Sequence, residues 1–253
     1  MEYSGNKEKI SAGSYDLNTF LHGGYEKDII TMIGGPAGSG KTTFCELVAV
    51  SQAKKGKKVV YMDSEGGFSI ERVKQLLDKD VGNLDFVLQH ILLLKPTNFI
   101  EQKKYFLQLL KYVKQKDIGV VIVDGMTMLY RLAMSDSHTE EGGRDFSVVR
   151  KHNFALAEQM GILAEISRKQ NIPVIVTNQV YSDFLSFDDL KSGKQREVHF
   201  VGGDLLKYWS KCIIELQFDY GKRKALLKKH RSLPEKEFAF QIVQTGIKRR
   251  GWI

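Results

Sequence analysis

Residues 35–42, GPAGSGKT, constrain the fold of this chain more than any other segment. They match the pattern G-x-x-x-x-G-K-[ST] at every specified position, follow the apolar run IITMI and precede a stretch with apolar residues at helical spacing. Such a loop surrounds phosphate oxygens with backbone N–H groups. The sequence therefore predicts a site for ATP and Mg²⁺, in which Lys41 neutralises phosphate charge and Thr42 ligates the metal. The predicted phosphate-binding residues are Gly35, Pro36, Ala37, Gly38, Ser39, Gly40, Lys41, Thr42 and Thr43.

Apolar runs typical of buried strands alternate along the chain with longer segments of helical period. The predicted strands are residues 29–33, 59–63, 91–94, 120–124 and 173–177, and the predicted helices are 42–55, 69–78, 99–116 and about 147–170. This order predicts an α/β fold with a mostly parallel central sheet flanked by helices. Residues 212–218, 224–229 and 238–243 predict antiparallel strands at the C-terminal end, the first two joined by a glycine-containing hairpin.

Composition limits the class of protein. With 253 residues, 42% of them hydrophobic, and only four prolines, the chain is predicted to form a single domain over residues 1–253, with an N-terminal extension at 1–10. The sequence contains no apolar run as long as a signal peptide or a membrane span. Cys45 and Cys212 lack the spacing of a metal site or a disulfide framework, so both are expected to be buried thiols of a cytoplasmic protein.

Polar residues follow three of the predicted strands, at the positions where α/β proteins bind ligands. Asp124 ends the run VVIVD and is the second predicted metal ligand, beside Thr42. Glu65, just after the strand that ends at Asp63, is the candidate to orient or deprotonate an attacking water, with Asp63 as support. Gln179, in VTNQV, is the candidate contact of the γ-phosphate. Without the P-loop, simpler interpretations would hold: a polar turn closed by two glycines, and a solvated strand end for Gln179.

Four segments, ISAGSYDLNTFLHGGYEKDIITMIGGPAGSGKT, YMDSEGGFSIERV, IVDGMT and IPVIVTNQV, resemble RecA-family recombinases of the RadA-like branch. The resemblance extends over almost the whole chain and implies a RecA-like P-loop ATPase core, in which Glu65 activates water and Gln179 senses the γ-phosphate. The segments GGDLLKYWSK and LLKKHRSLPEKEFAFQI resemble a paralogous branch more than the recombinase itself. The implied setting is DNA repair and homologous recombination, with DNA and a RadA-type recombinase as partners and a homo-oligomer as a further option.

Two features of the full recombinases are not expected in this chain. One is a separate helical N-terminal domain, and the other is a linker with the Phe-x-x-Ala motif through which subunits dock. The one such string, FALA at residues 154–157, falls within a predicted helix, where core packing is the expected role. The sequence therefore favours an accessory protein with weak ATPase activity, DNA-dependent or DNA-independent, that modulates the main recombinase. The alternatives are an autonomous strand-exchange recombinase and a nucleotide-controlled regulatory switch without significant hydrolysis.

The net charge of +8 is concentrated near the C-terminus. Residues 222–250 contain ten Lys or Arg and two Glu, a balance equal to the excess of the whole chain. The segments that correspond to the family's DNA-binding loops, 131–146 and 181–203, contain more acidic than basic residues. Contacts to single-stranded and duplex DNA, led by phosphates, are therefore predicted at the basic tail, with a solvated basic face as the alternative. The candidate residues, for DNA or for a neighbouring subunit's nucleotide, are Lys222, Arg223, Lys224, Lys229 and Arg231.

Overall fold

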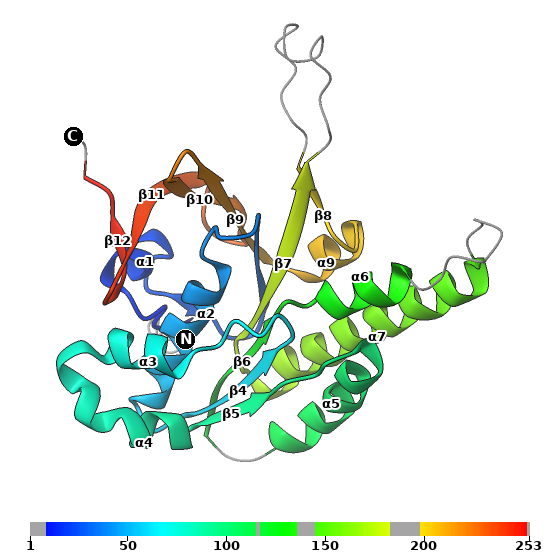
Figure 1. Ribbon diagram of the computed structural model, residues 1–253, viewed down its shortest axis with the longest axis horizontal. Helices are drawn as coiled ribbons and strands as arrows, with labels where there is room; N and C mark the ends of the chain where they lie inside the picture. The colour runs from blue at the N-terminus through cyan, green and yellow to red at the C-terminus, as the bar shows by residue number, and fades with distance from the viewer. Residues whose placement is uncertain (1–8, 115–116, 136–144, 183–197, 252–253) are drawn as a thin grey trace, which may run out of the picture.

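A large sheet with helices on both faces organises the computed structural model, which describes residues 9–114, 117–135, 145–182 and 198–251 (Figure 1). Its strand order is β12-β11-β10-β9-β3-β7-β6-β4-β5, with β8 paired to β7. The five predicted parallel strands are confirmed as β3 (Ile30–Gly35), β4 (Lys58–Asp63), β5 (Ile91–Leu94), β6 (Ile118–Asp124) and β7 (Val174–Ser182). The predicted α/β class with a mostly parallel sheet is therefore correct.

Burial on both faces explains why the inner strands β3, β4, β6 and β7 are mostly apolar runs. In β6, Val120 and Ile122 pack into one core, whereas Val121 and Val123 pack into the other. The alternation follows from the period of two in a strand, which sends successive side chains to opposite faces of the sheet.

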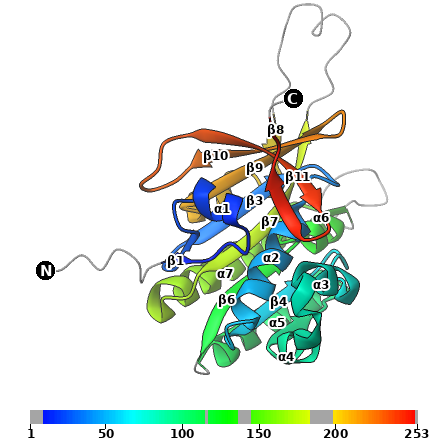
Figure 2. The same ribbon diagram turned by 90° about the vertical axis from the view of Figure 1, so that its left-hand side faces the viewer.

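Helices cover both faces (Figures 1 and 2). One face carries α2 (Lys41–Ala53), α3 (Ile70–Leu77), a 3₁₀ turn (Asp78–Asn83) and α4 (Leu84–Gln89). The other carries α5 (Phe99–Tyr112), α6 (Met128–Ser135), α7 (Phe146–Gln170) and α9 (Asp204–Trp209). The helix α7 begins at the N-cap Asp145, whose side chain accepts the backbone N–H groups of Ser147 and Val148, and ends at Asn171 in the left-handed region. Every helix in the described ranges is too short or too polar to cross a lipid bilayer.

The C-terminal strands extend the sheet in antiparallel order, as predicted. They are β9 (Cys212–Asp219), β10 (Lys222–Lys229), β11 (Lys236–Val243) and β12 (Gly246–Arg249). Tyr220 and Gly221 join β9 to β10 with φ angles of 44° and 73°, the pair of positive values that a tight hairpin needs. Because β9 runs parallel to β3, this hairpin lies at the same edge of the sheet as the end of β3.

The N-terminal segment adds a small two-stranded sheet and packs its apolar side chains into one of the two cores. Strands β1 (Lys9–Ile10) and β2 (Tyr25–Glu26) pair with each other, and α1 (Tyr15–Phe20) lies between them in the sequence. The hydroxyl of Ser14 donates to the carbonyl of Ile247 at 2.9 Å, which ties this segment to β12.

Three expectations need correction. In the expected loop 131–146, residues 131–135 belong to α6 and Phe146 begins α7, and the expected loop 181–203 contains the end of β7 and the strand β8 (Val198–Phe200), which pair with each other. Residues 136–144 and 183–197 lie outside the described ranges. The core-packing expectation for FALA is wrong for Phe154, which is 72% exposed, although Ala155 and Leu156 are buried. The predicted helix is confirmed as α7, but Phe154 lies on its exposed face rather than on the face that packs into the core.

Candidate nucleotide site

The candidate site lies at the edge where the parallel strands β3, β7, β6 and β4 end. Gly35 stands beside Gln179 in the register of β3 and β7, and Asp63 stands beside Asp124 in that of β4 and β6. Parallel strands in register deliver their carboxyl ends to one edge of the sheet, where open α/β folds bind ligands. The structure therefore brings the P-loop and the predicted polar residues together.

The P-loop is held in a tight conformation that depends on its glycines. At Gly35 an added Cβ would lie 2.6 Å from Ser39 Oγ and 2.8 Å from the carbonyl oxygen of Leu216. Gly38 and Gly40 have φ angles of 72° and 109°, a region that favours glycine. Ser39 Oγ is buried and has no hydrogen-bond partner in the described part of the chain. A cradle of this kind, with an orphaned hydroxyl, fits a bound phosphate group.

Lys41 begins the helix α2 and is 6% exposed. Its Nζ atom donates to the carbonyl oxygens of Gly35 at 2.9 Å and Pro36 at 3.0 Å. Burial lowers the pKa of Lys41, and the negative charges of Glu65 and Asp124 act in the opposite direction. The ammonium is therefore held inside the loop, within reach of the phosphates that the loop would bind.

Asp124 is fully buried at the end of β6. Tyr61 donates its hydroxyl to Oδ2 at 2.9 Å, and Thr177 donates its hydroxyl to Oδ1 at 2.6 Å. Burial raises the pKa of Asp124, and hydrogen bonds from Thr177, Thr42 and Tyr61 oppose this effect. Thr42 and Asp124 are thus close enough to share one metal ion. In the described part of the chain, no cluster of three or more His, Cys, Asp or Glu residues is placed to hold a metal ion.

Asp63 organises the loop that follows β4. Its Oδ1 accepts the backbone N–H groups of Gly66 at 2.8 Å and Gly67 at 3.1 Å, and its Oδ2 accepts that of Phe68 at 3.0 Å. The polar-turn interpretation therefore describes Asp63, which closes the turn with its own side chain.

Of the two acids Asp63 and Glu65, Glu65 is the one that faces the P-loop. Its Oε1 atom accepts a hydrogen bond from Gln179 Nε2 at 3.1 Å, and its side chain lies over Gly125, where an added Cβ would be 2.6 Å from Glu65 Cγ. Burial is the largest cause of the raised pKa of Glu65, and Lys41 acts against it. A carboxylate with a raised pKa beside a phosphate site has the properties of a general base.

Glu46 is a buried acid that the sequence analysis did not single out. It is 2% exposed on α2, and its Oε1 atom accepts the backbone N–H of Ser69 at 3.2 Å. Burial raises the pKa of Glu46 to about 7, with smaller contributions from Asp63 and Asp124, while Arg72 opposes the shift. A glutamate at a helical position reads in the sequence as a surface residue, so no sequence signal could have identified it.

The candidate basic residues divide between the two ends of β10. At the P-loop end, Arg223 donates from Nη2 and Nε to the carbonyl oxygen of Gly38 at 3.0 and 3.3 Å, with its guanidinium 4.2 Å from the ring centroid of Phe218. At the opposite end, Lys229 donates to the carbonyl of Lys207, and Arg231 forms a bidentate pair with Asp28. The five candidates therefore do not form one surface.

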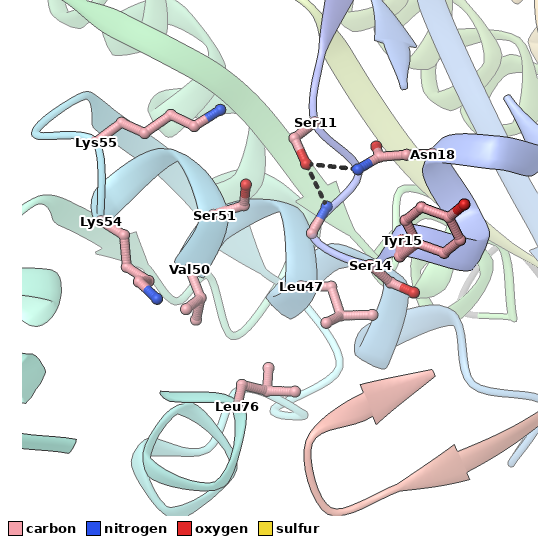
Figure 3. A pocket seen from close by; sticks show the side chains of 11 residues that line it. Ser11, Ser14, Tyr15, Asn18, Leu47, Val50, Ser51, Lys54, Lys55 and Leu76 are labelled. Atoms are coloured by element: carbon pink, nitrogen blue, oxygen red, sulfur yellow. Dashed lines mark hydrogen bonds between the residues drawn. The ribbon is translucent and has the colours of Figure 1, made fainter. Parts of the chain in front are cut away.

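A cavity of about 560 Å³ lies elsewhere, between the N-terminal segment, α2 and α3 (Figure 3). The figure shows Ser11 bonded to Asn18 and to a backbone N–H at its upper rim, with Leu47 and Leu76 below. None of the predicted site residues lines this cavity, so its size does not make it the nucleotide site.

The fold and the site together define a P-loop nucleotide-binding protein with a RecA-like core. The sequence profile of the Rad51 family matches residues 6–250. The chain therefore belongs to the Rad51 family.

RadB proteins are among the relatives of this chain. The DNA repair and recombination protein RadB of Methanobrevibacter smithii is 39% identical over 247 residues, covering 96% of this chain and 96% of that protein. The RadB of Methanococcus maripaludis strain C7 is 38% identical, covering 91% of this chain and 96% of that protein. A crystal structure of the RadB recombinase has a TM-score of 0.73 at 32% identity, covering 96% of this chain and 100% of that chain. These similarities confirm the prediction, made from the two C-terminal segments, that the chain resembles a paralogous branch more than the RadA-type recombinase itself.

The buried carboxyl of Glu46 predicts a pH dependence of stability. Because the pKa of Glu46 is about 7 in the folded protein, against an ordinary value of 4.5, the folded state holds this proton more tightly than the unfolded state. Stability from this group is present below pH 4.5 and is lost as the pH rises towards 7, by about 3 kcal/mol in total. Glu46→Gln should lack this loss, so thermal unfolding of both proteins between pH 5 and pH 8 measures it. Parallel melting curves across this range would contradict the assignment.

Proposed function

We propose that this chain binds ATP and Mg²⁺ at the described edge and acts as a RadB-type accessory protein of DNA repair and homologous recombination, with weak ATPase activity. The observation that carries the proposal is the convergence of Lys41, Asp124 and Glu65 at one edge of the sheet, beside a P-loop in which a side chain at Gly35 would collide with Ser39 and Leu216. The names of the RadB relatives support the setting in repair and recombination.

The residues of the site suit phosphoryl transfer to water. Bound ATP with Mg²⁺ supplies an activated phosphoanhydride and offsets its charge. Lys41 would exchange the carbonyls of Gly35 and Pro36 for phosphate oxygens, and Thr42 and Asp124 would hold the metal. Glu65 would orient the attacking water and accept its proton, and Gln179, already bonded to Glu65, would report the presence of the γ-phosphate.

Replacing Glu65 by glutamine should separate ATP binding from hydrolysis. The amide keeps the size of the side chain but cannot accept a proton, so ATP affinity should persist while the single-turnover rate falls by at least about a hundredfold. Fluorescence titration with a nucleotide analogue and quenched single-turnover hydrolysis provide the two measurements. Lys41→Ala is the control, because it should lose nucleotide binding itself. Hydrolysis by Glu65→Gln at the wild-type rate would show that Glu65 is structural.

We further propose that DNA phosphates bind at the C-terminal sheet. A cavity of about 520 Å³ there is lined by five basic residues, Lys222, Arg223, Lys224, Arg249 and Arg250, and by one acid, Glu237. Lys224 is 3.1 Å from Glu237, which leaves a basic excess. Alternation along β10 points Arg223 towards Gly38, so Lys222 and Lys224 are the candidates on the opposite face.

Neutralising Lys222 and Lys224 together should weaken DNA binding and its salt dependence. Each lost phosphate contact should lower the slope of log K against log salt by about 0.7 to 0.9. Fluorescence anisotropy with single-stranded and duplex oligonucleotides at several salt concentrations measures both quantities. Arg131→Gln is the matched control, because Arg131 is an exposed cation on α6. A larger loss from Arg131→Gln would place the DNA contacts near α6 instead.

The proposed protein partner is a RadA-type recombinase. The chain should bind such a recombinase in a pull-down with purified proteins, and the amount retained should change when ATP is added. By itself the chain should give no strand exchange. Strand exchange by the isolated protein would instead support an autonomous recombinase, and binding that responds to ATP without any hydrolysis would support a regulatory switch.

A further inference from the structure

The loop at residues 64–69, which carries Glu65, lies along the helix that begins at the P-loop lysine. It touches α2 at two positions that are one helical turn apart. An added Cβ on Gly67 would lie 3.1 Å from Thr42 Oγ1, so the loop backbone passes closely over this residue. The backbone N–H of Ser69 donates to Glu46 Oε1 at 3.2 Å. Residues i and i+4 share one face of a helix, so Thr42 and Glu46 form a single surface beneath the loop.

Contacts with other elements hold the rest of the loop and the helix α3 that follows it. Asp63 holds the loop from Gly66 to Phe68 through three backbone N–H groups. Beyond the loop, Arg72 in α3 donates to the carbonyl oxygens of Val243 and Gln244, which ties α3 to the turn between β11 and β12. These contacts anchor the segment to β4 and to the C-terminal sheet. Glu46 supplies the polar contact between the end of the loop and α2.

Burial makes this contact stronger than a surface hydrogen bond. Glu46 is 2% exposed, and the low dielectric of a protein interior strengthens a hydrogen bond relative to one that is open to water, whether the carboxyl is ionised or neutral. Loss of the acceptor would leave the N–H of Ser69 without its described partner at the first residue before α3. The last residue of the loop would then lose its hydrogen bond to α2, while Gly66, Gly67 and Phe68 would remain bonded to Asp63.

We propose that Glu46 is a positioning residue, which holds the loop of Glu65 against the P-loop helix and so sets the place of Glu65 relative to the phosphates. The proposal rests on the proposed ATPase function for its consequence, but the contact itself is independent of any reaction. Displacing a reacting group by about 1 Å can cost about a hundredfold in rate. Glu46 therefore affects hydrolysis without touching the nucleotide.

Three variants test the proposal. Glu46→Met removes the acceptor at similar volume, Glu46→Gln keeps an oxygen that can accept the Ser69 N–H, and Glu71→Ala removes an exposed acid of α3 as the control. Hydrogen exchange of a peptide covering residues 64–70 measures the loop directly, without nucleotide. ATP affinity and single-turnover hydrolysis measure the consequence. Glu46→Ala provides a second acceptor-free variant should Glu46→Met fail to unfold cooperatively.

The expected pattern has two parts. Exchange at residues 64–70 should be faster in Glu46→Met and close to wild type in Glu46→Gln and Glu71→Ala. Hydrolysis by Glu46→Met should fall about tenfold to a hundredfold at unchanged ATP affinity, and Glu46→Gln should recover most of it. Unchanged exchange in both acceptor-free variants would overturn the positioning role. If the wild-type protein hydrolyses no ATP, the proposed ATPase function fails, and the exchange measurement still decides whether Glu46 holds the loop.

Discussion

The parallel register of β4, β6, β7 and β3 is the constraint on which the site depends. These strands are buried on both faces, so their side chains are mostly apolar, and the polar residues of the site lie at the ends of β4 and β6 and, in β7, at residues 177–179 beside the end of β3. Register then places those ends together, with Asp63 beside Asp124 and Gly35 beside Gln179. The same hydrophobic burial that stabilises the sheet therefore assembles the polar residues at one edge.

Several acids are buried together at this edge, and the pKa values of Glu46, Glu65 and Asp124 are raised as a result. Glu46, Asp63 and Asp124 are each no more than 2% exposed, and Glu65 lies close to them. Burial raises the pKa of Glu46, Glu65 and Asp124, whereas Lys41 is the basic group whose charge acts on Glu65. An excess of buried negative charge is costly unless it is paired. A divalent cation would offset this cost, so the metal that we propose would stabilise the arrangement as well as serve its chemistry.

The sequence was sufficient for the parts of the structure that local pattern determines. The five central strands are continuous apolar runs and the P-loop is a local motif, so both could be predicted. Helices α4 and α9 contain only six residues each, less than two helical turns and too few for a clear helical period. The partners of Asp124 were missed for another reason: Tyr61 and Thr177 lie 63 and 53 residues away and meet it only through the register of the sheet. The exposure of Phe154 could not be predicted either, because it depends on which face of α7 packs against the rest of the protein.

Thr42 and Asp124, in our proposal, hold a metal ion together with the phosphates of ATP. Isothermal titration of ATP into the wild-type protein and Asp124→Asn, with Mg²⁺ and with a chelator, tests it most directly. Asp124→Asn keeps the size of the side chain but removes its charge. We expect Mg²⁺ to tighten ATP binding by the wild-type protein and to have much less effect on binding by Asp124→Asn. An equal effect of Mg²⁺ on both proteins would contradict the proposal.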